Sequence, residues 1–172
     1  MTSYARLIRD IPDFPKKGIL FKDITPLLRD ARGLADAVEA LASHHRDDRV
    51  GAIAAVESRG FIFGGALALR LGAGFIPIRR PGKLPHDTLS ESYALEYGTD
   101  TIEVHRDAIA TGDRILIVDD LLATGGTASA ATSLVRKLGG EVVGASFLVE
   151  LTFLGGRARL SGVPVFSLIR YD

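Results

Sequence analysis

The stretch that decides the fold is ILIVDDLLATGGT, at residues 115–127. An apolar run leads to two carboxylates, Asp119 and Asp120, and then to a turn of small residues at 124–127. Residues 128–138 carry apolar side chains at helical spacing, so the turn is expected at a helix N-terminus. Free backbone N–H groups and the helix dipole favour a phosphate there. The stretch therefore predicts a strand that leads into an anion-binding loop.

The two carboxylates do not suit the same phosphate, because like charges repel. They suit sugar hydroxyl groups or a divalent cation beside the phosphate. A sugar phosphate satisfies both demands. The plainer alternative is a strand followed by an N-capped helix with a solvated acidic turn. A Walker-type phosphate loop is excluded, since that loop needs a Lys before its hydroxyl residue.

Helix and strand patterns alternate along the rest of the chain. Several apolar runs are nearly continuous, as expected for a parallel sheet that is covered on both faces. We therefore expect an α/β fold with a mainly parallel twisted sheet flanked by helices, and ligands beyond the carboxyl ends of the strands, where Glu57 and Asp119 stand. The expected helices are residues 33–45, 61–71 and 128–138, and the expected strands are 52–56, 75–78, 115–118, 142–149 and 165–169.

Residues 79–106 interrupt this alternation. The segment is punctuated by Pro and Gly, is basic where it begins, and has a hairpin pattern on either side of residues 98–100. Long excursions of this kind in compact domains are usually functional or disordered. We interpret the segment as a mobile lid over an anionic substrate; the alternative is a charged surface hairpin without a function.

Composition narrows the class of protein. The 172 residues have zero net charge and no long basic run, so no nucleic acid or anionic membrane is expected as a partner. The absence of Cys excludes a disulfide framework and agrees with a reducing compartment. No apolar stretch approaches the ~20 residues of a membrane span. We expect a single cytoplasmic domain, residues 1–172.

The histidines are expected at solvated surface positions and not in metal sites, because they lack metal-ligand spacing. They are His44, His45, His86 and His105.

Residues 115–127 resemble the 5-phosphoribosyl-1-pyrophosphate (PRPP) signature of the type I phosphoribosyltransferases. The resemblance covers nearly the whole chain, with matching segments at residues 14–15, 18–23, 57–61, 79–85, 93–98 and 149–151. It implies the type I phosphoribosyltransferase fold, with a small N-terminal hood at about residues 1–30 and a long lid hairpin at about 79–106. It also implies purine salvage: adenine and PRPP give AMP and pyrophosphate, with Mg²⁺ bound through PRPP and not directly by the protein.

The resemblance also implies roles for individual residues. It implies that Asp119 and Asp120 bind the ribose hydroxyls. The 5-phosphate would be bound by Ala123, Thr124, Gly125, Gly126 and Thr127. The pyrophosphate would be bound by Glu57, Ser58, Arg59, Arg79 and Lys83. Relatives have a non-proline cis peptide in the segment 57–59. The base would be bound by Leu20, Lys22 and Leu151. The catalytic residues would be Glu96, as the acid or base near N7, together with Arg59 and Tyr97.

Relatives are homodimers in which the arginine matching Arg79 reaches the neighbouring subunit's pyrophosphate site. We therefore expect that catalysis needs the dimer and that donating this arginine costs nothing in the donor's own site. Two positions depart from the commoner pattern, because Lys22 stands where many members have Arg, and Glu57 where some have Asp. We expect little functional consequence.

Two rival functions stay open on the sequence. A 6-oxopurine, xanthine or orotate phosphoribosyltransferase would share the fold. Relatives that act on hypoxanthine or guanine place a lysine after the strand that follows the signature helix, and residues 141–153 contain no Lys or Arg, which favours adenine. A non-catalytic PRPP sensor is the second rival. The absence of a helix-turn-helix extension or a basic face counts against it.

Overall fold

The computed structural model describes residues 4–94 and 98–172. The chain divides into two compact units, Met1–Ala40 and Leu41–Asp172, and the division falls inside one helix. The described helices are η1 (Tyr4–Leu7), α1 (Thr25–Arg29), α2 (Ala31–His44), α3 (Gly60–Leu71), α4 (Gly126–Lys137), η2 (Thr152–Leu154) and η3 (Gly156–Leu160). The described strands are β1 (Arg9–Pro12), β2 (Leu20–Asp23), β3 (Ala52–Val56), β4 (Gly74–Ile78), β5 (Thr88–Ala94), β6 (Thr99–His105), β7 (Arg114–Leu122), β8 (Glu141–Leu151) and β9 (Val165–Tyr171).

The first unit is built around a two-stranded antiparallel sheet of β1 and β2. Cross-strand charge pairs join the strands: the Arg9 guanidinium donates to Asp23 at 2.6 and 3.0 Å, and Lys22 Nζ lies 2.7 Å from Asp10 Oδ1. Cross-strand pairs of opposite charge stabilise such ribbons.

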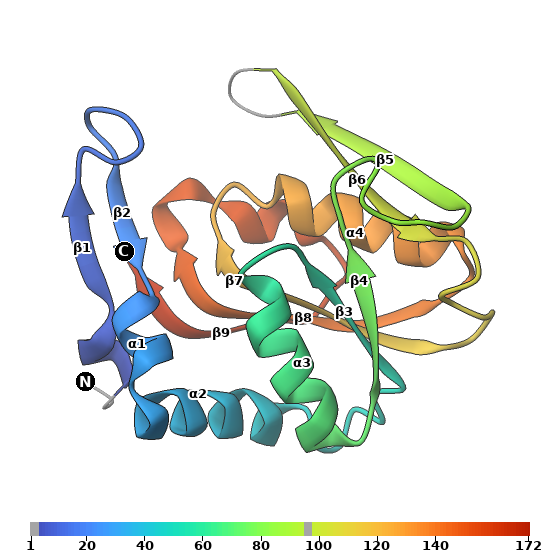
Figure 1. Cartoon of the computed structure of the whole chain (residues 1–172), viewed down its shortest axis with the longest axis horizontal. Coiled ribbons are helices and arrows are strands. Elements are labelled where there is room, and N and C mark those ends of the chain that lie inside the picture. Colours follow the sequence, from blue (N-terminus) through green and yellow to red (C-terminus); the bar gives the residue numbers. More distant parts are fainter. Residues whose placement is uncertain (1–3, 95–97) are drawn as a thin grey trace. The chain divides into compact units, whose positions relative to one another are not determined.

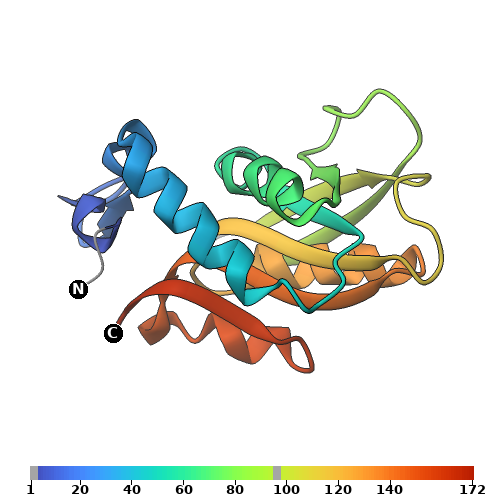
Figure 2. The ribbon, with the colours of Figure 1, turned by 90° about the horizontal axis from the view of Figure 1, so that it is seen from below.

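The second unit holds a five-stranded parallel sheet in the order β4-β3-β7-β8-β9 (Figure 1). Strand β3 pairs directly with β7, with Ala55 opposite Val118. The connection β3-α3-β4 runs outward on one side of this central pair, and β7-α4-β8 runs outward on the other. Because such crossovers are right-handed, α3 and α4 cover opposite faces of the sheet (Figures 1 and 2). The strand order reverses between β3 and β7, the point at which open α/β sheets bind ligands.

The hairpin of β5 and β6 packs on the α4 side of the sheet. Ile102 and Val104 of β6 are fully buried in the same apolar core as Leu134 and Val135 of α4. On its other edge, Glu91 of β5 accepts hydrogen bonds from α4. The part of the expected lid that the structure describes is therefore anchored to the core at its base. The tip of the hairpin, where Glu96 and Tyr97 fall, lies outside the described residues.

Two sequence-based expectations are wrong. The strand expected to end before the acidic pair continues through it, so Asp119 and Asp120 belong to β7. His45, expected at the surface, is 3% exposed, and its Nδ1 lies 2.7 Å from Asp48 Oδ2. His45 stands four residues after the buried Leu41, so helical spacing continues the apolar face of α2 to it. Burial is the main cause that lowers the pKa of His45.

The helices of the described residues include none that is long and apolar enough to cross a membrane.

Helix α3 is confirmed with its expected end at Gly72, which is left-handed (φ 66°) and caps the helix.

Candidate active site

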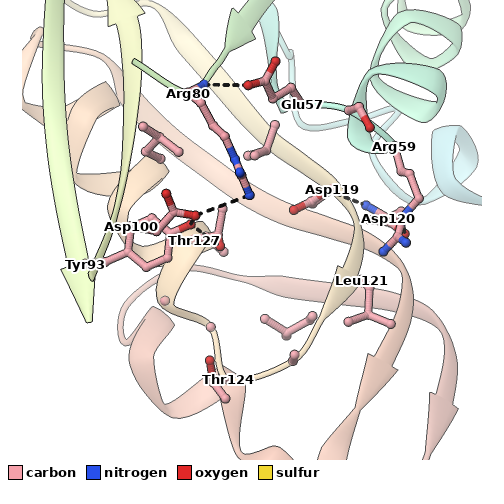
Figure 3. A pocket seen from close by; sticks show the side chains of 18 residues that line it. Glu57, Arg59, Arg80, Tyr93, Asp100, Asp119, Asp120, Leu121, Thr124 and Thr127 are labelled. Carbon is pink, nitrogen blue, oxygen red and sulfur yellow. Dashed lines mark hydrogen bonds and ion pairs between the residues drawn. The ribbon is translucent and has the colours of Figure 1, made fainter. Parts of the chain in front are cut away.

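A cavity of about 640 Å³ opens at the carboxyl ends of β3 and β7 (Figure 3). Two loops form most of its wall. The β3–α3 loop is residues 57–59, and the β7–α4 loop is residues 123–127, which include the first two residues of α4. The site residues expected from the sequence that line it are Glu57, Ser58, Arg59, Asp119, Asp120, Ala123, Thr124, Gly125, Gly126 and Thr127.

The β7–α4 loop presents backbone to the cavity. Gly125 is left-handed (φ 80°) and precedes α4, and Ser129 N–H bonds back to its carbonyl oxygen at 2.9 Å. This conformation favours glycine. The first residues of the helix line the cavity, and the first amides of a helix have no partner within it. Such amides, with the helix dipole behind them, make an anion site. The loop can therefore hold a phosphate without a charged side chain of its own.

The β3–α3 loop is held by side chains. Its Glu57–Ser58 peptide bond is cis, as the resemblance implied. The Glu57 carboxylate accepts hydrogen bonds from the backbone N–H of Arg80 at 2.7 Å and from Arg79 Nε at 2.8 Å. Burial alone would raise the pKa of Glu57, but these two hydrogen bonds lower it below its ordinary value. Glu57 thus ties the loop to the chain that leaves β4.

The two acids differ in their surroundings. Asp120 is 5% exposed, and its Oδ2 lies 2.6 Å from Nε of Arg59. Asp119 Oδ1 accepts the backbone N–H of Asp120 at 2.8 Å. Burial, and next the neighbouring Asp120 carboxylate, raise the pKa of Asp119. Asp120 therefore orients Arg59 from the adjacent strand, while Asp119 is the acid less stabilised by positive charge.

The start of α3 lies very close to β7 at the acidic pair. A Cβ at Gly60, the first residue of α3, would lie 2.8 Å from Asp119 Oδ1. Real Cβ atoms essentially never approach an atom so closely, and backbone atoms of β7 would lie at 3.2 Å as well, so a larger residue here would displace Asp119. The close approach brings the β3–α3 loop against the acidic pair.

The hairpin completes the wall. The Tyr93 ring packs on Gly126, where a Cβ would meet it at 2.9 Å, and its hydroxyl accepts a hydrogen bond from Thr127 Oγ1 at 3.0 Å. The same hydroxyl lies 3.3 Å from Asp100 Oδ2, and Arg80 Nη2 lies 3.7 Å from that oxygen. Figure 3 shows Arg80 extending between Glu57 and Asp100. Burial is the first cause that raises the pKa of Tyr93.

Some residues of this wall were not expected from the sequence. The polar ones are Arg80, Tyr93 and Asp100, and the apolar ones are Val56, Ile102, Leu121, Leu122 and Ala128. The sequence pair Arg79-Arg80 could have indicated Arg80. Side chains alternate along an extended segment, so only one of two neighbouring arginines can face the pocket. Which one does so depends on the register of the strand before it.

Other expected residues lie outside this wall. Arg79 does not line the cavity; its Nε bonds Glu57 and its Nη1 donates to the carbonyl oxygen of Lys83 at 3.2 Å. Arg79 therefore holds its own β3–α3 loop, which differs from the expectation that its donation costs nothing in its own site, and its role in a partner's site stays a prediction. Lys83 is exposed, and Leu151 is half-buried at the end of β8.

The remaining expected residues keep their roles as predictions. Leu20 and Lys22 belong to β2 of the first unit, where Leu20 is 49% exposed and Lys22 is buried. Glu96 and Tyr97 fall outside the described residues.

Comparisons with known proteins agree with this arrangement. The family model of the phosphoribosyl transferase domain matches residues 27–159. The adenine phosphoribosyltransferase of Solibacter usitatus is 58% identical over 172 residues, which is 100% of this chain and 99% of that protein. The crystal structure of adenine phosphoribosyltransferase from Thermoanaerobacter pseudethanolicus has a TM-score of 0.96 at 56% identity and covers 98% of each chain.

A third relative was solved with ligands. The Saccharomyces cerevisiae adenine phosphoribosyltransferase, complexed with adenine and an imino-altritol bisphosphate, has a TM-score of 0.89 at 41% identity, over 98% of this chain and 99% of that one. The chain belongs to the phosphoribosyl transferase family, among the adenine phosphoribosyltransferases.

Proposed function

We propose that the cavity between the β3–α3 and β7–α4 loops is where the chain carries out the reaction of its family. Adenine displaces pyrophosphate from C1 of PRPP: the bond from C1 to the pyrophosphate oxygen breaks, the bond from C1 to N9 forms, and the base loses one proton. The observation that carries the proposal is the pairing of two anion-binding loops around Asp119 and Asp120 in one cavity. One loop suits each phosphate end of PRPP, and the acids between them suit the ribose.

The two ends of PRPP make different demands. We assign the 5-phosphate to the β7–α4 loop, whose backbone amides suit a phosphate that stays bound throughout the reaction. We assign the pyrophosphate to the β3–α3 loop, where Arg59 brings a positive charge to the group that leaves. Arg80 lines the same cavity and adds a second guanidinium. Charge that develops on a leaving group is best stabilised by donors that are already oriented, and Asp120 orients Arg59.

The ribose lies between these ends in the proposal. The carboxylates of Asp119 and Asp120 accept hydrogen bonds from its 2- and 3-hydroxyls. In this family the transition state resembles an oxocarbenium ion, so catalysis depends on positioning and on nearby negative charge. The acids and the two loops supply both.

The oxygen donors of the site and the substrate fit a Mg²⁺ ion that is bound through PRPP. The described residues include no group of three or more His, Cys, Asp or Glu that could hold a metal by themselves. Carboxylate and phosphate oxygens are the ligands that Mg²⁺ prefers, and it is usually bound through substrate phosphates plus one or two carboxylates. Asp119 and Asp120 are the carboxylates nearest the proposed ribose position. When bound, the ion would supply positive charge to the pyrophosphate.

The base side of the proposal rests on the resemblance. Leu20 and Leu151 would be the apolar walls for the purine, Lys22 would contribute through its main chain, and Glu96 would take the proton from N7 as N9 attacks. Tyr97 would close over the site. Adenine as the base agrees with the absence of a cationic side chain in residues 141–153.

A direct assay tests the function. Adenine, hypoxanthine, guanine and orotate are offered with PRPP, with and without Mg²⁺. We expect turnover of adenine only with the metal, and kcat/KM for hypoxanthine lower by about 100-fold or more, a ratio that a polar mismatch in a purine pocket can supply. Comparable kcat/KM for adenine and hypoxanthine would refute the assignment.

We also propose a homodimer. Leu69 is 87% exposed, and Ile62, which is 41% exposed, lies two turns before it on the same face of α3. Phe75 is a further exposed apolar residue, on the edge strand β4. Exposed apolar residues that share one helix face mark interaction surfaces. We expect Leu69→Glu to shift the sedimentation of the protein toward monomer and to lower activity, while Leu69→Met keeps the dimer. A fully active monomer would exclude a role for Arg79 in a partner's site.

A cytoplasmic location is proposed on the absence of cysteine, which agrees with a reducing compartment. Fractionation of cells that express the protein tests it.

A further inference from the structure

We infer that residues 155–160 brace the β7–α4 loop, and that Arg157 is a positioning residue for the 5-phosphate end of the substrate. These residues, called the brace below, follow β8 and include η3. Arg157 does not line the cavity. The inference deepens the proposed function, because it assumes that the β7–α4 loop holds the phosphate.

The brace and the loop touch through their backbones. A Cβ placed on Gly156 would lie 2.3 Å from the carbonyl oxygen of Ala123 and 3.1 Å from the backbone nitrogen of Gly125. A Cβ on Gly125 would in turn lie 2.4 Å from the carbonyl oxygen of Gly156. Two glycines from distant parts of the chain are therefore required at one contact. Nothing larger than hydrogen fits between the loop and the brace.

This contact limits where the loop can go. The amides proposed to bind phosphate belong to the turn that Gly156 supports from behind. A loop that is free on one side can relax away from a phosphate, whereas a loop with backbone packed against it holds its amides in one arrangement. Preorganised donors of this kind bind an anion without further ordering. The position of Gly156 thus affects the geometry of phosphate binding directly.

Arg157, the next residue, ties the brace to the sheet. Its Nε and Nη2 donate to the two carboxylate oxygens of Glu150 at 2.7 and 2.8 Å, and its Nη1 donates to the carbonyl oxygen of Val165 at 2.8 Å. Such bidentate pairs fix direction as well as distance. Glu150 is 3% exposed near the end of β8, and Val165 begins β9. The guanidinium therefore joins the brace to two adjacent strands.

Glu150 and Arg157 each stabilise the charge of the other. The hydrogen bond from Arg157 is the first cause that lowers the pKa of Glu150, and the same bond raises the pKa of Arg157. Arg170 lies 3.7 Å from Glu150 as well, at a more exposed position. Loss of Arg157 would remove the bidentate partner of a buried carboxylate, which is unfavourable. Leu160, which is 3% exposed, would still hold the brace by apolar packing.

Steady-state kinetics test the inference on the full-length protein. We expect Arg157→Met to raise KM for PRPP about 10-fold, since small displacements of binding groups have effects up to about 100-fold. We expect kcat and KM for adenine to stay within about twofold. Arg157→Lys should recover part of the PRPP affinity, because Lys can keep the charge but not the bidentate geometry. Arg159→Met, two residues away and exposed, is the matched control and should leave KM for PRPP unchanged.

A second variant covers the case in which Arg157→Met does not fold. Gly156→Ala leaves the ion pair in place and pushes directly on the Ala123 carbonyl, so KM for PRPP should rise while KM for adenine stays unchanged. Gly74→Ala is its control, since a Cβ there would meet Ala52 Cβ at 3.5 Å and the Gly51 carbonyl oxygen at 3.7 Å, both ordinary contact distances. Equal rises in both KM values, or unchanged KM for PRPP in Gly156→Ala and in folded Arg157→Met, would overturn the inference. A wild-type protein that does not use PRPP would instead refute the proposed function.

Discussion

The β3–α3 loop and the β7–α4 loop occupy equivalent places in the fold but are held in different ways. Each follows a central parallel strand and leads into a helix. The β3–α3 loop is fixed by charged side chains, Glu57 to the chain after β4 and Arg59 to Asp120. The β7–α4 loop is fixed by backbone contact with Gly156 and by the Tyr93 ring on Gly126. A loop that must present charge is positioned through charge, whereas a loop that presents amides is positioned through shape.

This difference predicts that glycine substitutions damage the β7–α4 loop most. In Gly125→Ala the new Cβ would require a left-handed conformation at φ 80° and would meet the Gly156 carbonyl oxygen at 2.4 Å. We expect kcat/KM for PRPP to fall about 100-fold or more, because the phosphate-binding amides are displaced. Titration with ribose 5-phosphate should show the same loss. Unchanged affinity for ribose 5-phosphate would contradict the phosphate assignment of this loop.

In the β3–α3 loop the largest effect is expected from charge. Arg59→Ala removes the partner of the buried Asp120 and the cation proposed for pyrophosphate. We expect kcat/KM for PRPP to fall about 30-fold, in the range measured when one member of a buried charge pair is removed. Affinity for ribose 5-phosphate, which lacks the pyrophosphate, should change by less than about threefold. Equal losses for both ligands would mean that the two loops do not act separately.

A smaller, pH-dependent effect is expected at Glu57. Glu57→Gln weakens the hydrogen bonds from Arg80 and Arg79, so the free energy of unfolding should fall by about 2 kcal/mol at pH 7. The folded-state pKa of Glu57 lies below its unfolded value, so its contribution is present above the unfolded pKa and is lost as the pH falls through the folded one. Urea unfolding at several pH values should therefore show wild type and variant converging below about pH 4. A difference that stays constant with pH would show that the carboxylate charge is not responsible.

The smallest effect is expected from the Tyr93 hydroxyl. Tyr93→Phe keeps the ring on Gly126 and removes only the hydroxyl, which accepts a hydrogen bond from Thr127 and donates one to Asp100 at 3.3 Å. Since a neutral hydrogen bond contributes about 1 kcal/mol, KM for PRPP should change by no more than about fivefold. Tyr93→Ala removes the ring as well and should have the larger effect. The reverse order would mean that hydrogen bonding, and not shape, holds the β7–α4 loop.

Contiguous features were predictable from the sequence. The β7–α4 loop, its strand and its helix form one segment, so the apolar run, the acids and the glycines could be interpreted together. The alternation of helices and strands, and the parallel sheet, followed from apolar runs of strand length. Helix α3 and strand β3 were placed within one residue at each end.

Features that depend on distant residues could not be predicted in this way. Gly156 is required because of Gly125, thirty-one residues earlier, and no local pattern indicates that contact. The direction of Arg80 depends on the register of β4, and the burial of His45 on its contact with Phe166 of β9. The extent of β7 was underestimated because acids are uncommon in strands, although here Asp120 is paired with Arg59.

Strands β3 and β7 are neighbours in the sheet, with Ala55 opposite Val118. Adjacent strands lie about 4.8 Å apart, a spacing set by backbone hydrogen bonds and the same for every sequence. The pairing of the two strands therefore fixes the distance between the loops that follow them, and side-chain substitutions do not change that distance. Variants of this protein could alter either loop to bind another base or another phosphate while the spacing between the loops stays the same.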